Sequence, residues 1–157
     1  MIYHTFTTIE QLKKDFSQKP EMVFSLLSID QMKELKIPIS KSSEYSFRYA
    51  CKMQERFHLG EEAISKSAWY SYRYAQLIVG GKFPLGEPAI GSIAEYAYTY
   101  AELVLCGRFE LGELAISKKA DYAFSYAKYV IKQKFPLGEP AINSDSTTKY
   151  MYSIAFP

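Results

Sequence analysis

Most of the chain carries a pattern of hydrophobic and polar positions that repeats every 26 residues. Each copy reads F-x-L-G-E-x-A-I and continues with aromatic residues at alternate positions. The copies begin at Phe57, Phe83, Phe109 and Phe135. A partial copy begins upstream near residue 37, and its Tyr49 matches Tyr74 at a spacing of 25. A fixed period of this length predicts a tandem array of small units, each packed against the next.

Proline and glycine positions predict a short first helix in each copy. Proline is tolerated in a helix only in the first turn, and the copy from Phe83 carries proline at positions 84 and 88. Gly86 is therefore expected at the N-cap, with Glu87 beside the positive end of the helix dipole. The equivalent glycines are Gly60, Gly112 and Gly138. The short helix is expected to end near Ser65, Gly91, Ser117 or Asn143.

The aromatic run predicts a longer second helix, over residues 68–79 in the first complete copy. One apolar helical face holds Tyr70, Tyr74, Leu77 and Ile78, and a second apolar face holds Tyr72, Ala75 and Val79. Aromatic residues at alternate positions also fit a β-strand, but the helical pattern that follows them favours a helix. A helix with two apolar faces needs a neighbour on each side, as in a stack of repeats.

Polar residues and glycines mark the expected ends of the second helix. In the copy from Phe83, Ser92 and Glu95 fit a capping box at the start, and Gly107 fits a helix stop. Gly80 and Gly81 fit the stop in the copy before it.

Residues 1–36 do not match the repeat. They predict one helix over residues 8–16, capped by Thr7 or Thr8 and broken at Pro20, and another over residues 28–35. The sequence thus predicts an all-α fold, with a helical N-terminal capping region at 1–36. Residues 37–157 are predicted to form an α-solenoid of short two-helix repeats, with copies that start near residues 37, 57, 83, 109 and 135.

The motif [KR]-F-P-L-G-E-x-A-I followed by Y-x-Y-x-Y-A resembles a short tandem repeat seen in proteins of bacteriophages, other large DNA viruses and some bacteria. The resemblance covers residues 37–157 and implies stacked helices and a viral or mobile-element origin. It brings no catalytic residue to this chain. A phage-encoded protein of this kind would act in the cytoplasm of the host cell.

Composition and charge narrow the classes of function. The chain has 19 basic and 17 acidic residues, so the basic excess typical of a strong polyphosphate binder is missing. Cys51 and Cys106 show no metal-binding or disulfide spacing, which predicts two free thiols in a reducing cytosol. Met1 to Thr5 lacks the pattern of a secretory leader, and no apolar run approaches the ~20 residues that span a bilayer. We therefore expect a cytoplasmic protein without a membrane segment.

Candidate catalytic chemistry is scarce. His4 and His58 have no partner at a useful spacing, and His58 occupies a variable position of the repeat. The sequence holds no nucleophile elbow, P-loop, HExxH motif or dinucleotide fingerprint. These observations argue against an enzyme and suggest neither a cofactor nor a metal site.

Repeated charges and tyrosines allow two interpretations. The cations before each copy, together with exposed tyrosines, could bind nucleic acid or a nucleotide through phosphate contacts and base stacking. Alternatively, each repeated glutamate pairs with a cation, and tyrosines 70, 96 and 122 and tyrosines 74, 100 and 126 fill the core. We favour the second interpretation because every copy keeps both charges and needs a filled core face. The cations are Arg56, Lys82, Arg108 and Lys134, and the glutamates are Glu61, Glu87, Glu113 and Glu139.

Binding information is expected where the copies differ, on the exposed side of the second helix. The two rows concerned change the sign of their charge along the array, which suits a patterned protein partner better than a uniform phosphate backbone. One row holds Arg48, Arg73, Thr99 and Ser125, and the other holds Gln76, Glu102 and Lys128. The leading hypothesis is a protein-binding adaptor or inhibitor, with a host defence or nuclease component as its target. Self-association through the last copy is a further alternative.

Overall fold

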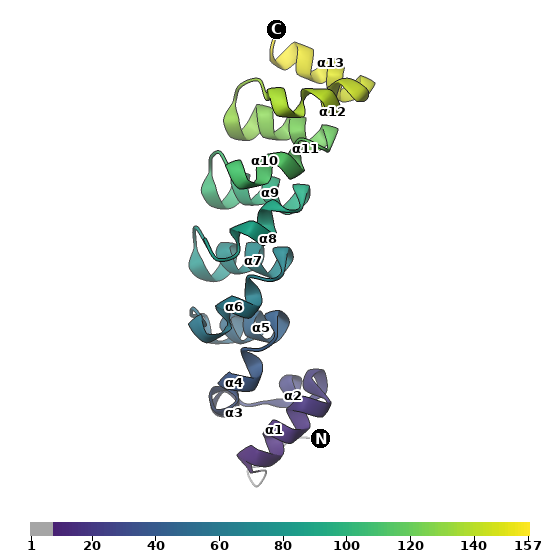
Figure 1. The fold of residues 1–157 in the computed structure, drawn as a ribbon. Helices are drawn as coiled ribbons and strands as arrows, with labels where there is room; N and C mark the ends of the chain where they lie inside the picture. Colours follow the sequence, from purple (N-terminus) through teal and green to yellow (C-terminus); the bar gives the residue numbers. More distant parts are fainter. Residues whose placement is uncertain (1–7) are drawn as a thin grey trace. The chain divides into compact units, whose positions relative to one another are not determined.

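The computed structural model describes residues 8–157, and in this range the chain is helical and contains no β-strand (Figure 1). The all-α prediction is therefore confirmed. The chain divides into two compact units, residues 1–64 and 65–157. The predicted boundary between residues 36 and 37 falls inside the first unit and stays a prediction. The inferences drawn from Met1 to Thr5, from His4 and from Thr7 lie outside the described residues.

The first unit begins with three helices before the partial repeat, and a fourth helix, Lys36–Ile39, opens that repeat. Thr8 caps the first helix by accepting a hydrogen bond from the Gln11 N–H at 3.2 Å, and Ser28 forms a capping box with Gln31. Pro20 begins a further helix that the sequence analysis did not predict, because proline suits a first helical turn as well as a break. The elements are α1 (Ile9–Gln18), α2 (Pro20–Leu26), α3 (Ile29–Glu34), α4 (Lys36–Ile39), α5 (Ser43–Met53), the 3-10 turn η1 (His58–Gly60) and α6 (Glu61–Ile64).

In the second unit, short and long helices alternate along the chain (Figure 1). Each short helix contacts the long helix before it, and the long helices α7, α9, α11 and α13 lie beside one another in sequence order. The α-helices are α7 (Ala68–Tyr74), α8 (Glu87–Gly91), α9 (Ala94–Tyr100), α10 (Glu110–Ile116), α11 (Ala120–Ser125), α12 (Glu139–Ser144) and α13 (Ser146–Ala155). The π segments η2 (Ala75–Val79), η3 (Ala101–Leu105) and η4 (Tyr126–Ile131) continue α7, α9 and α11 without a break, which makes these the long helices. The remaining element is the 3-10 turn η5 (Pro136–Gly138).

Fully buried side chains recur at one position of each helix. The motif isoleucine of the short helix and the third tyrosine of the long helix are both excluded from solvent. They are Ile64, Ile90, Ile116, Ile142, Tyr74, Tyr100 and Tyr126. Burying each of these aliphatic side chains stabilises the fold by about 1.5–3 kcal/mol.

Several predicted helix ends are corrected by the structure. Gly86 and Gly138 are N-caps as predicted, but Gly112 lies inside α10. The capping box is wrong, since Ile93 precedes α9 and the Ser92 hydroxyl donates to the Ala89 carbonyl at 2.7 Å. Cys106, and not Gly107, is the left-handed residue that ends the second helix, with φ at 49°.

Glycine at the start of the short helix is required by close packing. A Cβ on Gly86 would lie 2.5 Å from Cδ1 of Phe83 and 2.6 Å from the Cβ of Ser71. The φ of Gly86 is −91°, which any residue can adopt, so space rather than backbone freedom explains this glycine.

The wide last turns of the long helices explain the difference between 25 and 26 residues. In η2, η3 and η4 the backbone forms π turns, and the left-handed residue follows six positions after the buried tyrosine: Gly80 after Tyr74, Cys106 after Tyr100 and Lys132 after Tyr126. In α5 no π turn forms, and the left-handed Gln54 follows Tyr49 by five positions. The additional residue of the longer copies is thus absorbed as a π turn.

Candidate functional site

A hydrogen-bonded link between tyrosine, glutamate and phenylalanine recurs within the copies of the second unit. The hydroxyl of Tyr126 accepts from the Phe109 N–H at 2.9 Å and donates to Oε1 of Glu113 at 3.0 Å. Tyr100 joins the Phe83 N–H at 3.0 Å and Glu87 at 2.9 Å in the same way. In the last copy Tyr152 joins Phe135 at 2.7 Å and Glu139 at 3.2 Å. The tyrosine hydroxyl therefore holds the first residue of its own copy in place through a backbone hydrogen bond.

Burial sets the electrostatics of this link. Burial raises the pKa of both Tyr100 and Tyr126 above its usual value, and the neighbouring carboxylates raise it further. The phenols are therefore neutral donors at neutral pH. Glu87, Glu113 and Glu139 each accept a hydrogen bond from the tyrosine of their own copy, which limits their use as a charged track for a ligand.

The expected pairing of glutamates with cations holds in two copies. Arg56 lies 2.8 Å from Glu61, and Arg108 donates two hydrogen bonds to Glu113, at 2.7 and 3.0 Å. In the range that the structure describes, neither Lys82 nor Lys134 forms an ion pair with a carboxylate, and Lys134 donates to the Pro157 carbonyl at 3.2 Å. His58 is mostly exposed, and its Nδ1 lies 3.4 Å from Glu61.

The tyrosine rows serve the packing between copies. The ring of Phe109 meets Tyr100 of the preceding copy edge-on at 5.1 Å, and Phe135 meets Tyr126 at 5.2 Å. Tyr74, Tyr100 and Tyr126 are completely buried, so their faces are closed to a nucleobase. Tyr96 is half-buried and stacks on Tyr72 at 6.3 Å. The core interpretation therefore holds for the row of Tyr74, Tyr100 and Tyr126. It is wrong for the other row, since Tyr70, Tyr96 and Tyr122 are only half-buried, and Leu77 of the same predicted face is 51% exposed.

The first predicted protein-binding row is partly engaged in local contacts. Arg48 lies 2.6 Å from Glu21 and 3.3 Å from Glu44, and its guanidinium covers the ring of Phe24. Thr99 donates to the Glu95 carbonyl at 2.8 Å. The remaining members, Arg73 and Ser125, are half-buried.

Two members of the second predicted row also form local hydrogen bonds. Gln76 accepts a hydrogen bond from Arg73 at 2.9 Å, and Glu102 accepts one from the Tyr98 hydroxyl at 2.7 Å. Lys128 is exposed and lies 5.1 Å from the ring centre of Tyr129. The structure thus brings Arg73 and Gln76 together, and the binding role of both rows stays a prediction.

Four exposed leucines were missed by the sequence analysis. The third residue of F-x-L-G is leucine in every copy, and between half and three-fifths of its surface faces solvent. The exposed fractions are 55% for Leu59, 53% for Leu85, 61% for Leu111 and 50% for Leu137. We call these four side chains the motif leucines. These leucines recur in the motif but belong to neither predicted core face. That combination was the sequence signal that could have predicted their exposure.

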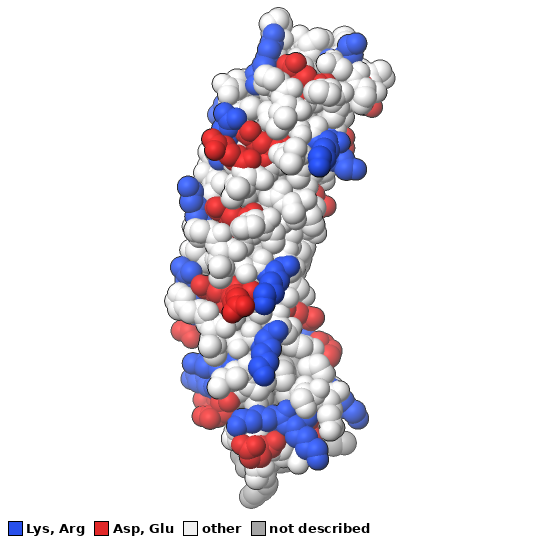
Figure 2. Space-filling view, in the orientation of Figure 1, with Lys and Arg blue, Asp and Glu red and all other residues white. Residues whose placement is uncertain are grey.

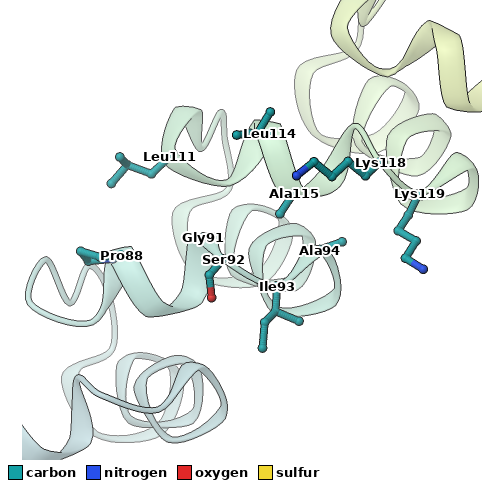
Figure 3. Close-up of a pocket in the computed structure, with 10 residues that line it drawn as sticks. All are labelled: Pro88, Gly91, Ser92, Ile93, Ala94, Leu111, Leu114, Ala115, Lys118 and Lys119. Atoms are coloured by element: carbon teal, nitrogen blue, oxygen red, sulfur yellow. The ribbon is translucent and has the colours of Figure 1, made fainter.

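An apolar groove lies beside one motif leucine in the second unit (Figure 3). It has a volume of about 630 Å³ and is formed by α8, the start of α9, and α10 with the turn that follows. No carboxylate is among its lining residues, which are Pro88, Gly91, Ser92, Ile93, Ala94, Leu111, Leu114, Ala115, Lys118 and Lys119. Figure 3 shows Leu111 and Leu114 on one side, with Lys118 and Lys119 beyond the end of α10.

No cluster of histidine, cysteine and carboxylate side chains among residues 8–157 could hold a metal ion, and neither Cys51 nor Cys106 is in a disulfide. The helices of this part of the chain are too short or too polar to cross a membrane. On the face drawn in Figure 2, positive and negative side chains form small groups separated by uncharged surface.

Comparison with known protein families, with curated proteins and with solved structures finds no match for this chain.

Proposed function

We propose that the chain is a non-catalytic protein-binding module, built as an α-solenoid of two-helix repeats with a helical N-terminal cap. The sequence period, the alternation of short and long helices and the recurring tyrosine link support this architecture. Repeat proteins of this kind use their extended surfaces for binding.

The motif leucines carry the proposal of protein binding. A leucine kept at one position of all four copies, with at least half of its surface in water, contributes little to the core of its own copy. Its transfer from water into an interface is favourable, because apolar burial yields about 25 cal/mol per Å². Exposed apolar positions that recur in this way are typical of a surface that a protein partner covers.

The role that follows is that of an adaptor or inhibitor. The resemblance to phage repeats makes a host defence or nuclease protein the target class, and this choice rests on analogy. The competing nucleic-acid interpretation needs free cations, yet Arg56 and Arg108 are engaged with glutamates. Lys82 and Lys134 remain as its candidate phosphate contacts.

Affinity capture tests the proposed function. The tagged full chain is incubated with bacterial lysate, with and without nuclease, and compared with a variant carrying Leu85→Ser, Leu111→Ser and Leu137→Ser. We expect one stoichiometric protein that survives nuclease and is lost with this variant. Recovery of nuclease-sensitive material alone, with an affinity that falls steeply with salt, would overturn the proposal in favour of nucleic-acid binding.

A matched control tests whether loss of any two exposed leucines would have the same effect. Leu77 and Leu103 are 51% and 54% exposed but belong to the second helices. The variant Leu77→Ser with Leu103→Ser should retain the partner. Far-UV circular dichroism of both variants checks that the helices are intact.

A further inference from the structure

The groove between α8, α9 and α10 has an apolar floor that its neighbours in the repeat lack. Leu114 is 62% exposed and occupies the position that proline holds at Pro88 and Pro140. Ile93 is 44% exposed at a position held by Lys119 and Asp145 in the next two copies. Leucine and isoleucine therefore meet in one groove because two adjacent copies depart from the repeat in the same place.

The rim of the groove is positive. Lys118 and Lys119 are both exposed, and neither forms an ion pair within residues 8–157. The carboxylate of α10 closest in sequence, Glu113, is 8% exposed and bonded to Arg108 and Tyr126. The two lysines thus lie at one end of an apolar groove without an ion pair among residues 8–157, and the nearest exposed carboxylate in sequence is Asp121 at the start of α11.

We propose that this groove binds an acidic amphipathic helix of a partner protein, an inference that rests on the proposed function. An amphipathic helix lays its apolar face into such grooves. The volume of about 630 Å³ is enough for several apolar side chains. Aspartate or glutamate on the flank of the incoming helix meets Lys118 and Lys119, which sets its orientation and accelerates association.

The spacing on α10 defines the complementary pattern. Leu111 and Leu114 lie at i and i+3 on α10, and Lys118 follows in the turn after the helix ends at Ile116. At about 1.5 Å per residue, the helix ends roughly 8 Å beyond Leu111, and the two lysines follow that end. The partner helix therefore carries two apolar residues three or four positions apart and an acidic residue one turn further along. A segment of about 12 residues covers this length.

Selection from a peptide library tests the inference. A phage-displayed library of random 12-residue peptides is selected on the immobilised full chain, and the enriched peptides are measured by fluorescence anisotropy. We expect enrichment of peptides with the stated apolar and acidic pattern. Their affinity should fall at least about tenfold for Leu114→Ser and for Lys118→Glu with Lys119→Glu.

Two controls are matched to these variants. Leu103→Ser removes an exposed leucine that is outside the groove and is not a motif leucine, and Lys82→Glu with Lys149→Glu makes the same change in net charge. Both should leave the peptide affinity unchanged. The inference is overturned by selected peptides without carboxylates, by equal affinity for all variants, or by no enrichment over an uncoated support.

The result also separates this inference from the proposed function. A captured protein that is lost with the motif-leucine variant but retained by Lys118→Glu with Lys119→Glu leaves the binding function intact and removes the acidic helix. Loss of acidic-peptide binding in the lysine variant, together with loss of the captured protein, supports both.

Discussion

At the scale of single residues, the tyrosine hydroxyl has a structural role that a phenylalanine could not perform. The hydroxyls of Tyr100, Tyr126 and Tyr152 each connect a backbone N–H with a glutamate thirteen residues away in the sequence. Buried polar groups need such partners, since an unpaired donor or acceptor costs about 1–3 kcal/mol. Tyr49 departs from this rule, because its buried hydroxyl has no hydrogen-bond partner. In its copy Lys36 stands in place of the glutamate, and the Met32 N–H donates to the Ser28 carbonyl at 2.9 Å instead.

This difference predicts opposite effects for one substitution. Tyr126→Phe leaves the Phe109 N–H without its acceptor and should destabilise the protein by about 1–3 kcal/mol. Tyr49→Phe keeps the same ring and removes an unpaired hydroxyl, so it should be neutral or stabilising. Urea unfolding of both variants measures the effect. Equal stability of the two would show that the hydroxyl link contributes nothing.

The raised tyrosine pKa values predict loss of stability at alkaline pH. Tyr100 and Tyr126 keep their protons in the folded chain at a pH where the unfolded chain, with a pKa near 10.0, releases them. Unfolding then releases protons, and the free energy of unfolding falls as pH rises above about 10. Tyr100 and Tyr126 should therefore add no pH dependence to the urea midpoint below about pH 9, and the midpoint should decline above that pH. The double variant Tyr100→Phe with Tyr126→Phe should decline less steeply, and an unchanged slope would contradict the assignment.

At the scale of elements, the π turns allow a copy to be one residue longer without changing which residues of its long helix face the core. Tyr100 and the residues before it lie in a regular helix, and the additional residue is confined to η3. The π turn therefore shifts the exit of the helix without rotating its buried face.

Deletion of one residue tests this separation. Removing Leu103, which is 54% exposed, should convert η3 into an α-helical end like that of α5 and leave the protein folded. Removing Thr99 should be far more damaging, since it turns Tyr100 by about 100° away from the core. Thermal unfolding by circular dichroism compares the two deletions. Equal losses would show that the wide turn is a required part of the copy.

At the scale of the whole molecule, the phenylalanine that opens each copy joins it to the copy before. In the second unit, Phe83, Phe109 and Phe135 pack on Tyr74, Tyr100 and Tyr126 respectively. Contacts of this type make the stability of a repeat protein a sum of copies and nearest-neighbour interfaces.

Phe109→Ala should weaken one such interface. The loss of a buried phenylalanine costs about 3–5 kcal/mol, and in an array the cost falls at one junction. Native-state hydrogen exchange should then show lower protection after residue 109 than before it within residues 65–157. A uniform loss of protection over that range would indicate that the unit unfolds as a single cooperative block.

Local rules explain how well the elements were predicted. Prolines 84 and 88, the N-cap glycines Gly86 and Gly138 and the apolar spacing over residues 68–79 identified the short and long helices correctly. The capping box at Ser92 was wrong because the serine hydroxyl bonds back to the preceding helix. The helix stop at Gly107 was one residue late, because Cys106 adopts the left-handed conformation that glycine usually supplies.

The candidate surface was less accessible to prediction. The exposed rows of the second helix were chosen because the copies differ there, whereas the motif leucines are the same in every copy. Their exposure depends on how closely the next copy packs against them. The spacing of residues within one helix does not predict that distance. The groove draws on residues from Pro88 to Lys119, so it exists only when three segments are packed together.

The sequence by itself determined the period, the two kinds of helix and most of their bounds, because these depend on interactions within a few positions along the chain. Tertiary structure alone decided that the Tyr126 hydroxyl meets an N–H seventeen residues before it. It also decided that Leu114 and Ile93 share a groove. Contacts at this separation follow from the angle and distance between packed helices, which the side chains of both helices set together.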